Sequence, residues 1–325
     1  MKRVVVTDAA FPSLEAERAA AERRGAAFQA FSCRTPDEVS EAVRGADVAV
    51  VQFAPLAEPA LRGVNPGCRL IRYGVGYDNI DLAAANRMAL PAAYVPDYCT
   101  DEVADHATAL ILASLRKIGG FDRSVRRGEW AATSVGRPIK PFGETTVGFF
   151  GLGRIGRAVR DRLAPFGFRF AFHDPAIGAA EAQGLAGRAV GRETLFRVSD
   201  LVTLHAPATP ETVRAVDGGS IAWMRPTAMV VNTSRGELID EPALAAALRE
   251  SRLGGAALDV FTREPLPPDS PLRDAPNLLL SPHAAWYSDA AIAKLQACVA
   301  DEIGRALDGL PPRRAIPGST AGGPA

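Results

Sequence analysis

The chain has 325 residues, enough for two ordinary domains, and 47% of them are hydrophobic, as expected for packed α/β layers. Its 37 lysines and arginines balance its 37 aspartates and glutamates, so no net charge favours nucleic acid or an anionic membrane, and we expect a small-molecule partner. The 4 cysteines are scattered without a CxxC pair, which argues against a metal site, and the lack of a signal peptide or a membrane-length apolar run predicts a cytoplasmic protein.

The first hundred residues alternate short apolar runs with helix-like segments. Apolar runs at 4–6, 48–51 and 70–73 predict the parallel strands of an α/β domain. The third run leads into Gly74-Val75-Gly76, a turn whose exposed backbone can hold an anion.

A long helix is predicted from Thr100 to Leu115, with the pair Gly119-Gly120 after it. Thr100 can cap its start, and the charges of Asp101 and Glu102 in the first turn suit the helix dipole. Apolar residues then recur at helical spacing until the glycines stop the helix. Because the pattern of the first domain ends just before it, we interpret this helix as a hinge between two domains.

Six buried strands are predicted after residue 145, with helical segments between some of them. Such an order describes a Rossmann-type doubly wound parallel sheet. The strands are expected at 147–150, 168–172, 201–204, 229–231, 256–259 and 278–280.

The final helix, at 289–307, is expected to return to the first domain. Residues 1–100 and 290–325 would then form a smaller, discontinuous, flavodoxin-like α/β domain, into which the Rossmann-type domain at 101–289 is inserted. Proline, arginine, glycine, serine and alanine dominate the end of the chain, so we expect 311–325 to be disordered.

A glycine-rich turn connects the first of the six strands to a helix. In Gly151-Leu152-Gly153-Arg154-Ile155-Gly156, Gly151 permits a tight turn, Gly153 lets a pyrophosphate approach the backbone, and Gly156 lets helix and strand pack closely. Amides at the helix start can then bind the anion. This pattern, in its strand-to-helix context, predicts a dinucleotide site.

An acidic residue ends the second of these strands. Asp174 lies 18 residues after Gly156, close to the spacing of a carboxylate that accepts the ribose hydroxyls. A carboxylate repels a 2′-phosphate, and Pro175 follows it in place of a basic residue or a serine. The expected cofactor is therefore NAD (NADH) rather than NADP.

Three strand ends carry groups suited to the reduction of a carbonyl. Such a reaction needs a proton donor at the oxygen and a cation that binds an adjacent carboxylate. Arg235 follows one strand, Glu264 the next and His283 the one after, and parallel strands bring their carboxyl ends to one edge. A glutamate beside the histidine would favour the imidazolium, which could then donate its proton at neutral pH.

Simpler interpretations exist for several of these residues. A strand-end arginine is often a surface or capping residue, and a Glu-Pro pair is often only a turn. His205 ends the strand before Arg235, and its spacing alone does not exclude it as the acid. His106, in the hinge helix, and His173, beside Asp174, could simply satisfy local hydrogen bonds.

Taken together, these motifs resemble the D-isomer-specific 2-hydroxyacid dehydrogenase family. The resemblance extends over most of the chain and implies an NAD-dependent oxidoreductase that interconverts a 2-oxo acid and a D-2-hydroxy acid, usually as a homodimer. It rests on the segments 72–81 (RYGVGYDNID), 151–156 (GLGRIG), 204–207 (LHAP), 232–236 (NTSRG), 257–260 (ALDV) and 281–283 (SPH).

The resemblance also implies roles for individual residues. The catalytic set would be Arg235, which binds substrate, Glu264, which tunes the acid, and His283, the proton donor. Substrate contacts would come from Arg235, the amides of Val75 and Gly76, Tyr73 and Trp286. Cofactor contacts would come from Gly151, Gly153, Arg154, Ile155, Gly156, Asp174, His205, Ala206, Pro207, Thr233, Ser234, Asp259, His283 and Ala285, with His205 in the cofactor wall and Asp259 at the nicotinamide carboxamide.

Residues 281–288 (SPHAAWYS) are most similar to the C-terminal-binding-protein-like branch, which includes NAD-sensing transcriptional corepressors. The alternative to an enzyme is therefore an NAD(H)-gated interaction protein, although no basic patch or long extension supports it. Trp286 would line the substrate side-chain pocket or else pack under the hinge. One departure is Ala107, followed by Thr108, where many relatives have a threonine that contacts phosphate.

Overall fold

The computed structural model describes residues 1–320, which form two compact units. One unit consists of residues 1–98 together with the segment that begins at Ser288, and the other is Cys99–Tyr287. The chain therefore leaves the first unit, completes the second, and returns. We describe each unit by itself.

The first unit contains a five-stranded parallel sheet in the order β2-β1-β3-β4-β5. This is the strand order of flavodoxin-like folds. The core of the unit is made by the strands and the short helices that connect them, with Val5, Val51 and Leu70 fully buried. Its elements are β1 (Arg3–Val6), α1 (Glu15–Glu22), β2 (Ala27–Ala30), α2 (Pro36–Ala42), β3 (Val48–Val51), α3 (Glu58–Leu61), β4 (Arg69–Arg72), α4 (Leu82–Arg87), β5 (Ala92–Tyr94) and α13 (Asp289–Leu307).

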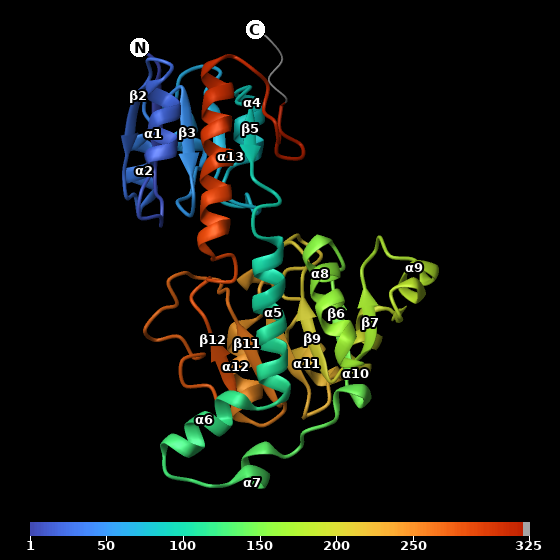
Figure 1. The fold of residues 1–325 in the computed structure, drawn as a ribbon. Helices are drawn as coiled ribbons and strands as arrows, with labels where there is room; N and C mark the ends of the chain where they lie inside the picture. The colour runs from blue at the N-terminus through green and yellow to red at the C-terminus, as the bar shows by residue number, and fades with distance from the viewer. Residues whose placement is uncertain (321–325) are drawn as a thin grey trace. The chain divides into compact units, whose positions relative to one another are not determined.

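The last helix, α13, begins after Ser288, whose Oγ accepts a hydrogen bond from the amide of Ala291 and caps the helix. It packs along α1 of the same unit (Figure 1). Leu295, Val299 and Ile303, spaced by four residues, are fully buried on its inner face. The expected return of the chain to the first sheet is therefore present in the structure.

The expectation of disorder at 311–325 is wrong for residues 311–320, and residues 321–325 lie outside the described part of the chain. The segment after α13 pairs with the edge strand β5, where the amide of Tyr94 donates to the carbonyl of Arg314 and the amide of Ile316 donates to the carbonyl of Ala92. The Ile316 side chain is 1% exposed. The reason is that β5 has an unpaired edge, which an extended segment of polar composition can cover through its backbone alone.

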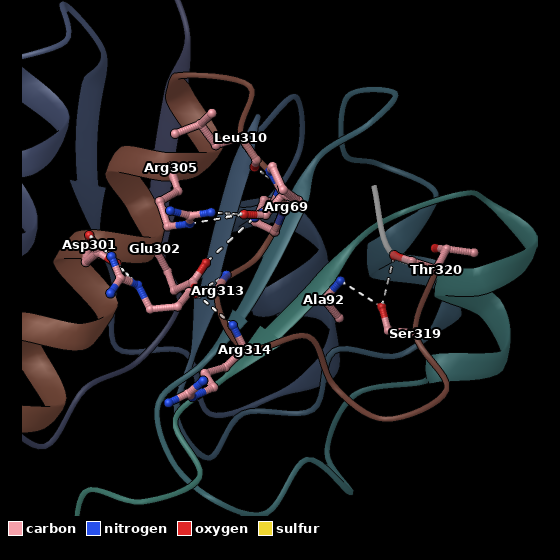
Figure 2. A network of polar contacts seen from close by, with 11 residues as sticks. Arg69, Ala92, Asp301, Glu302, Arg305, Leu310, Arg313, Arg314, Ser319 and Thr320 are labelled. Atoms are coloured by element: carbon pink, nitrogen blue, oxygen red, sulfur yellow. Dashed lines mark hydrogen bonds and ion pairs between the residues drawn. The ribbon is translucent and has the colours of Figure 1, made fainter. Parts of the chain in front are cut away.

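A buried carboxylate fixes this segment, which we call the C-terminal strap (residues 310–319). The Glu302 side chain accepts hydrogen bonds from the amides of Arg313 (2.7 Å) and Arg314 (3.2 Å), and Arg69 donates to the carbonyl of Leu310 (2.8 Å), as Figure 2 shows. Glu302 and Arg69 are almost fully buried, and these hydrogen bonds together with the ion pair between Arg69 Nη1 and Glu302 Oε2 (3.7 Å) offset part of the cost of desolvating the two charges. Glu302 Oε2 and the Nε and Nη1 of Arg69 have no hydrogen-bond partner among the described residues.

The second unit contains a seven-stranded parallel sheet in the order β12-β11-β10-β9-β6-β7-β8. The chain starts at β6, moves outward to β8, and then returns to β9 beside β6, which is the doubly wound Rossmann order expected from the sequence. Its strands are β6 (Thr146–Phe150), β7 (Arg169–His173), β8 (Gly187–Ala189), β9 (Leu201–Leu204), β10 (Met229–Asn232), β11 (Gly255–Leu258) and β12 (Leu278–Leu280).

Helices cover both faces of this sheet, and two apolar clusters fill the layers. One cluster joins α5 and α8 to residues such as Phe149 and Val231, and the other joins α10, α11 and α12 to residues such as Phe150 and Val230. Neighbouring residues of one strand thus enter opposite cores. The helices are α5 (Thr100–Leu115), α6 (Ile118–Arg126), α7 (Ala132–Gly136), α8 (Arg154–Leu163), α9 (Ala179–Gly184), α10 (Arg192–Val198), α11 (Gly218–Trp223) and α12 (Glu241–Arg249), with 3-10 turns η1 (Phe142–Glu144), η2 (Ala164–Phe166) and η3 (Gly236–Leu238).

In residues 1–320, no helix combines the length and the apolar character needed to cross a membrane.

Candidate functional site

The glycine turn after β6 is built as its sequence predicts. Gly151 has φ +92°, and a Cβ there would lie 2.7 Å from the amide nitrogen of Ala206, in the loop after β9. A Cβ at Gly156 would lie 2.8 Å from the carbonyl oxygen of Gly151. Around Gly153, by contrast, nothing lies within 4 Å of such a Cβ. The turn is therefore tightly packed at Gly151 and Gly156 and open at the middle glycine, Gly153, where α8 begins.

Asp174, directly after β7, connects this turn to the neighbouring strand. Its Oδ2 accepts from the amide of Leu152 (2.7 Å) and its Oδ1 accepts from the amide of Ala176 (2.8 Å). A carboxylate has about four acceptor sites, so each oxygen keeps capacity for one more donor such as a ribose hydroxyl.

The loops after β9 and β10 lie at the same carboxyl edge of the sheet as the glycine turn and form one wall of the candidate cofactor site. The Ser234 hydroxyl donates to the carbonyl of Ala206 (2.6 Å) and ties the two loops together. Beside it, the buried Thr233 Oγ1 has no hydrogen-bond partner among the described residues. An unpartnered buried hydroxyl next to an open glycine turn fits a site that a polar ligand completes.

His205 lies in this wall, with Nε2 3.0 Å from the Thr203 hydroxyl. Desolvation of the ring lowers the pKa of His205 to about 3. The ring is therefore neutral near pH 7 and has no imidazolium proton to donate, which argues against His205 as the acid that the sequence left open.

The loop after β12 is held by a buried carboxylate at the end of β11. Asp259 is fully buried; its Oδ1 accepts from the Ser281 hydroxyl (2.5 Å) and the Ala284 amide (2.9 Å), and its Oδ2 accepts from the Ala285 amide (2.9 Å). The amide of His283 donates to the Asp259 carbonyl (2.7 Å). Asp259, expected at the nicotinamide carboxamide, thus shapes the loop after β12 through both of its carboxylate oxygens.

His283 and Glu264 form a hydrogen-bonded pair. The Nδ1 of His283 lies 2.7 Å from Glu264 Oε2, while Glu264 Oε1 accepts from the amide of Phe261 (3.0 Å). Burial acts to raise the pKa of the Glu264 carboxyl, but the hydrogen bond and charge of His283, the Phe261 amide and the charge of Arg235 together lower it. An ionised glutamate at Nδ1 orients the ring and suits its imidazolium form.

Arg235 follows β10 in a turn that its neighbours fix. The Asn232 side chain donates to the carbonyl of Arg235 (2.7 Å) and accepts from the amide of Ser234 (3.0 Å). A Cβ at Gly236 would lie 2.0 Å from the carbonyl carbon of Phe261, so only glycine lets this turn meet the loop that carries Glu264. Arg235, Glu264 and His283 therefore come from three adjacent strand ends of one unit.

The substrate loop expected at 73–76 belongs to the other unit. Tyr73 was expected to contact substrate, but its side chain is 1% exposed and its hydroxyl donates to Glu17 Oε1 (2.9 Å), so it supports the loop from below. Arg72 Nε donates to Asn79 Oδ1 (3.1 Å), and its guanidinium also bonds the Tyr73 carbonyl, which shapes the same loop. Val75 and Gly76 are partly exposed.

Sequence reasoning missed the contact that joins His106 to Ser281, in the loop that carries His283. His106 was expected to make local hydrogen bonds, but its Nε2 lies 3.0 Å from Ser281 Oγ, 175 residues away.

Trp286 makes an edge contact with Tyr287 (5.9 Å between ring centroids). Residues 1–320 hold no group of three His, Cys, Asp or Glu side chains that could bind a metal.

Comparisons with known proteins show the family to which the chain is related. The family model described as "D-isomer specific 2-hydroxyacid dehydrogenase, NAD binding domain" matches residues 108–285. A glyoxylate reductase of Korarchaeum cryptofilum is 36% identical over 270 residues, which cover 82% of this chain and 81% of that one. A D-3-phosphoglycerate dehydrogenase of Synechocystis is 38% identical over 252 residues. The match covers 77% of this chain but only 45% of that relative, so the chain spans about half of the relative's length.

Among solved structures, an NAD-dependent formate dehydrogenase from Staphylococcus aureus in complex with NAD superposes with a TM-score of 0.81 at 30% identity, covering 94% of this chain and 95% of that one. The glycine turn, the free hydroxyl of Thr233 and the carboxylate of Asp174 fit the NAD(H) cofactor that this family uses.

Proposed function

The chain belongs to the D-isomer-specific 2-hydroxyacid dehydrogenase family, and from this premise we propose that it interconverts a 2-oxo acid and a D-2-hydroxy acid with NAD(H). The observation that carries the proposal is the His283–Glu264 pair, at 2.7 Å, in the unit that also holds the glycine turn. An acid beside a dinucleotide site is what the reduction of a carbonyl requires.

The proposed mechanism assigns one task to each side chain. NADH, when bound, supplies the hydride that reduces the carbonyl carbon. His283 donates a proton from Nε2 to the carbonyl oxygen, while Glu264 at Nδ1 stabilises the imidazolium. Arg235 binds the carboxylate next to the carbonyl in two-point fashion. In the oxidative direction, neutral His283 takes the proton back.

The remaining contacts are proposed on the basis of position. Residues 99–287 would bind the cofactor, with pyrophosphate at the amides of the glycine turn, the adenine ribose at Asp174, and His205, Ala206 and Thr233 as a wall. Residues 1–98 with the C-terminal segment would supply the amides of Val75 and Gly76 for the substrate carboxylate. Trp286 would select the substrate side chain.

The test is an assay of NADH oxidation with glyoxylate, hydroxypyruvate, phenylpyruvate and 4-methylthio-2-oxobutyrate. We expect turnover of at least one of them, and no turnover of any with NADH demonstrably bound contradicts the proposal. His283→Ala should abolish turnover and retain NADH affinity, because the ring acts on the substrate oxygen. Equal loss of both would assign His283 to the cofactor site instead.

We also propose that the chain forms a homodimer. The residues of α6 and the turn after it expose large apolar side chains, with Ile118 and Val125 both 55% exposed and Trp130 93% exposed. Such side chains on one short segment are typical of a surface that a second subunit covers. Light scattering coupled to gel filtration measures the mass, and Trp130→Asp should shift it toward the monomer.

A further inference from the structure

His106 is half-buried on α5, yet its imidazole contacts the loop that carries the proposed acid. Its Nε2 lies 3.0 Å from Ser281 Oγ and 3.6 Å from Asp259 Oδ1. Neither α5 nor Ser281 belongs to the proposed His283–Glu264–Arg235 set. The contact joins a helix on one face of the sheet to the ends of β11 and β12.

The donor and acceptor roles in this cluster follow from its chemistry. Asp259 Oδ1, 2.5 Å from the Ser281 hydroxyl, can only accept, so Ser281 donates its single proton there. The Ser281 oxygen must then accept from His106, which places a proton on His106 Nε2. The order of donation is His106 to Ser281 to Asp259.

Asp259 is also hydrogen-bonded to the loop after β12. Its two carboxylate oxygens accept from the amides of Ala284 and Ala285, and its own carbonyl accepts from the amide of His283. His283 has φ 52°, a left-handed conformation that a non-glycine residue keeps only where its surroundings hold it. The backbone of Ala284 and Ala285, directly after His283, is therefore held by the Asp259 carboxylate, and this requires the rotamer that Asp259 adopts.

We infer that His106 is a positioning residue: through Ser281 it holds Asp259 in the rotamer that fixes residues 283–285 and hence the proton donor. The inference rests on the proposed function for the role of His283, but not for the bonds that hold the loop. Outer hydrogen bonds of this kind commonly change rates by about 10-fold to 100-fold when they are removed, because the reacting group loses its alignment.

Four variants of the full chain test the inference. His106→Leu removes the donor at similar size, His106→Gln keeps an N–H donor, Ser281→Ala breaks the next bond, and the double variant His106→Leu with Ser281→Ala tests whether both act in one chain. Ser114→Ala is the matched control, since this residue of α5 has a buried hydroxyl without a hydrogen-bond partner among the described residues.

The expected result is a fall in kcat of about 10-fold for His106→Leu, with the Kd of NADH changed by no more than about 2-fold, because the glycine turn, Asp174 and Thr233 are not altered. His106→Gln should recover most of the rate, the double variant should be no slower than Ser281→Ala, and Ser114→Ala should match the wild type. Amide hydrogen exchange over residues 281–287 should rise in His106→Leu and Ser281→Ala, and not in the control.

Unchanged exchange at 281–287 in His106→Leu, or rate losses that multiply in the double variant, would overturn the inference. The exchange measurement needs no substrate. If the wild type reduces no 2-oxo acid while exchange still rises in His106→Leu, the proposed function fails and the positioning role stands.

Discussion

Two histidines follow strands at the carboxyl edge of the second sheet, and their surroundings give them different chemistry. His283 has an ionised glutamate 2.7 Å from Nδ1, whereas the Nε2 of His205 lies 3.0 Å from the neutral hydroxyl of Thr203. Both residues follow an apolar strand, so spacing alone treats them alike. The hydrogen-bond partner of the ring, a carboxylate for His283 and a hydroxyl for His205, distinguishes the proposed acid from a residue that only lines the cofactor site.

We predict that His205→Gln keeps turnover within about 3-fold of the wild type, since a ring with a pKa of about 3 is neutral throughout the working range and donates no proton. The pH profile of kcat/KM should keep its shape. Steady-state assays between pH 5 and 9 provide the measurement. A loss as large as that of His283→Ala would restore His205 as the acid.

We predict that Glu264→Gln lowers kcat/KM for reduction by about 10-fold and removes a fall of kcat/KM at acid pH. The Glu264 carboxyl has a lowered pKa, so it is ionised at neutral pH, and its charge beside His283 is lost only as the pH falls through that lowered pKa. A neutral amide removes both the charge at Nδ1 and the group that titrates, and steady-state assays over a range of pH measure the two effects. Glu250→Gln, on an exposed ion pair with Arg252, is the control and should leave the profile in place.

For Asp174→Ala we expect NADH affinity to fall by about 10-fold and the preference for NADH over NADPH to narrow, because the variant loses an acceptor for ribose hydroxyls and a charge that repels the 2′-phosphate. Loss of the bond to the Leu152 amide would weaken both cofactors equally. The ratio of the two dissociation constants, measured by fluorescence titration, isolates the charge, and an unchanged ratio would refute its role.

Residues close to their strand in the sequence were predictable, and residues joined over long distances were not. Gly151, Asp174, Arg235 and His283 each follow an apolar run, and the structure places them at the ends of β6, β7, β10 and β12. The burial of Tyr73 against Glu17 depends on how α1 packs, which periodicity does not specify. The bond from His106 to Ser281 likewise depends on how α5 lies on the sheet.

At the scale of elements, the strands and long helices follow from periodicity, but the C-terminal strap does not. Its residues lack any apolar period because only Ile316 enters the core. Its polar contacts include backbone pairing with β5, the bonds to Glu302 and Arg69, and the bond from the Ala92 amide to the Ser319 hydroxyl (Figure 2). Composition alone therefore predicted disorder. A bare strand edge elsewhere in the chain was the missing information.

We predict that a chain ending at Leu310 melts about 5–10 °C lower than the wild type and associates with itself as its concentration rises. It loses a buried isoleucine and the backbone partners of β5, a change of about 2–3 kcal/mol in the free energy of unfolding. Scanning fluorimetry and gel filtration measure the two effects.

A chain ending at Thr320 keeps the strap and is the control for this truncation. It should behave as the full chain does. Equal melting temperatures for the two truncated chains would show that the strap adds nothing to stability.

At the scale of the whole molecule, the two units differ in how the chain builds them. The first needs both ends of the sequence, since α13 buries one face against α1 and the strap places Ile316 in the core and covers the edge of the sheet. The second is continuous, and both of its apolar clusters consist entirely of residues between Cys99 and Tyr287. A continuous segment with its own two-sided core meets the usual condition for folding independently.

The final prediction concerns residues 99–287 expressed alone. We expect this segment to unfold in one cooperative transition and to bind NADH within about 10-fold of the full chain, because the glycine turn, Asp174 and the wall at Thr233 all lie inside it. It should not turn over any 2-oxo acid, since the loop at Val75 and Gly76 is missing even though His283 and Glu264 remain.

Calorimetry and fluorescence titration test the fold and the binding, with Asp174→Ala in the same segment as the control for specific binding. A folded segment that binds no NADH would assign part of the cofactor site to residues 1–98 and the C-terminal segment, and turnover by the segment would show that the substrate amides are not required.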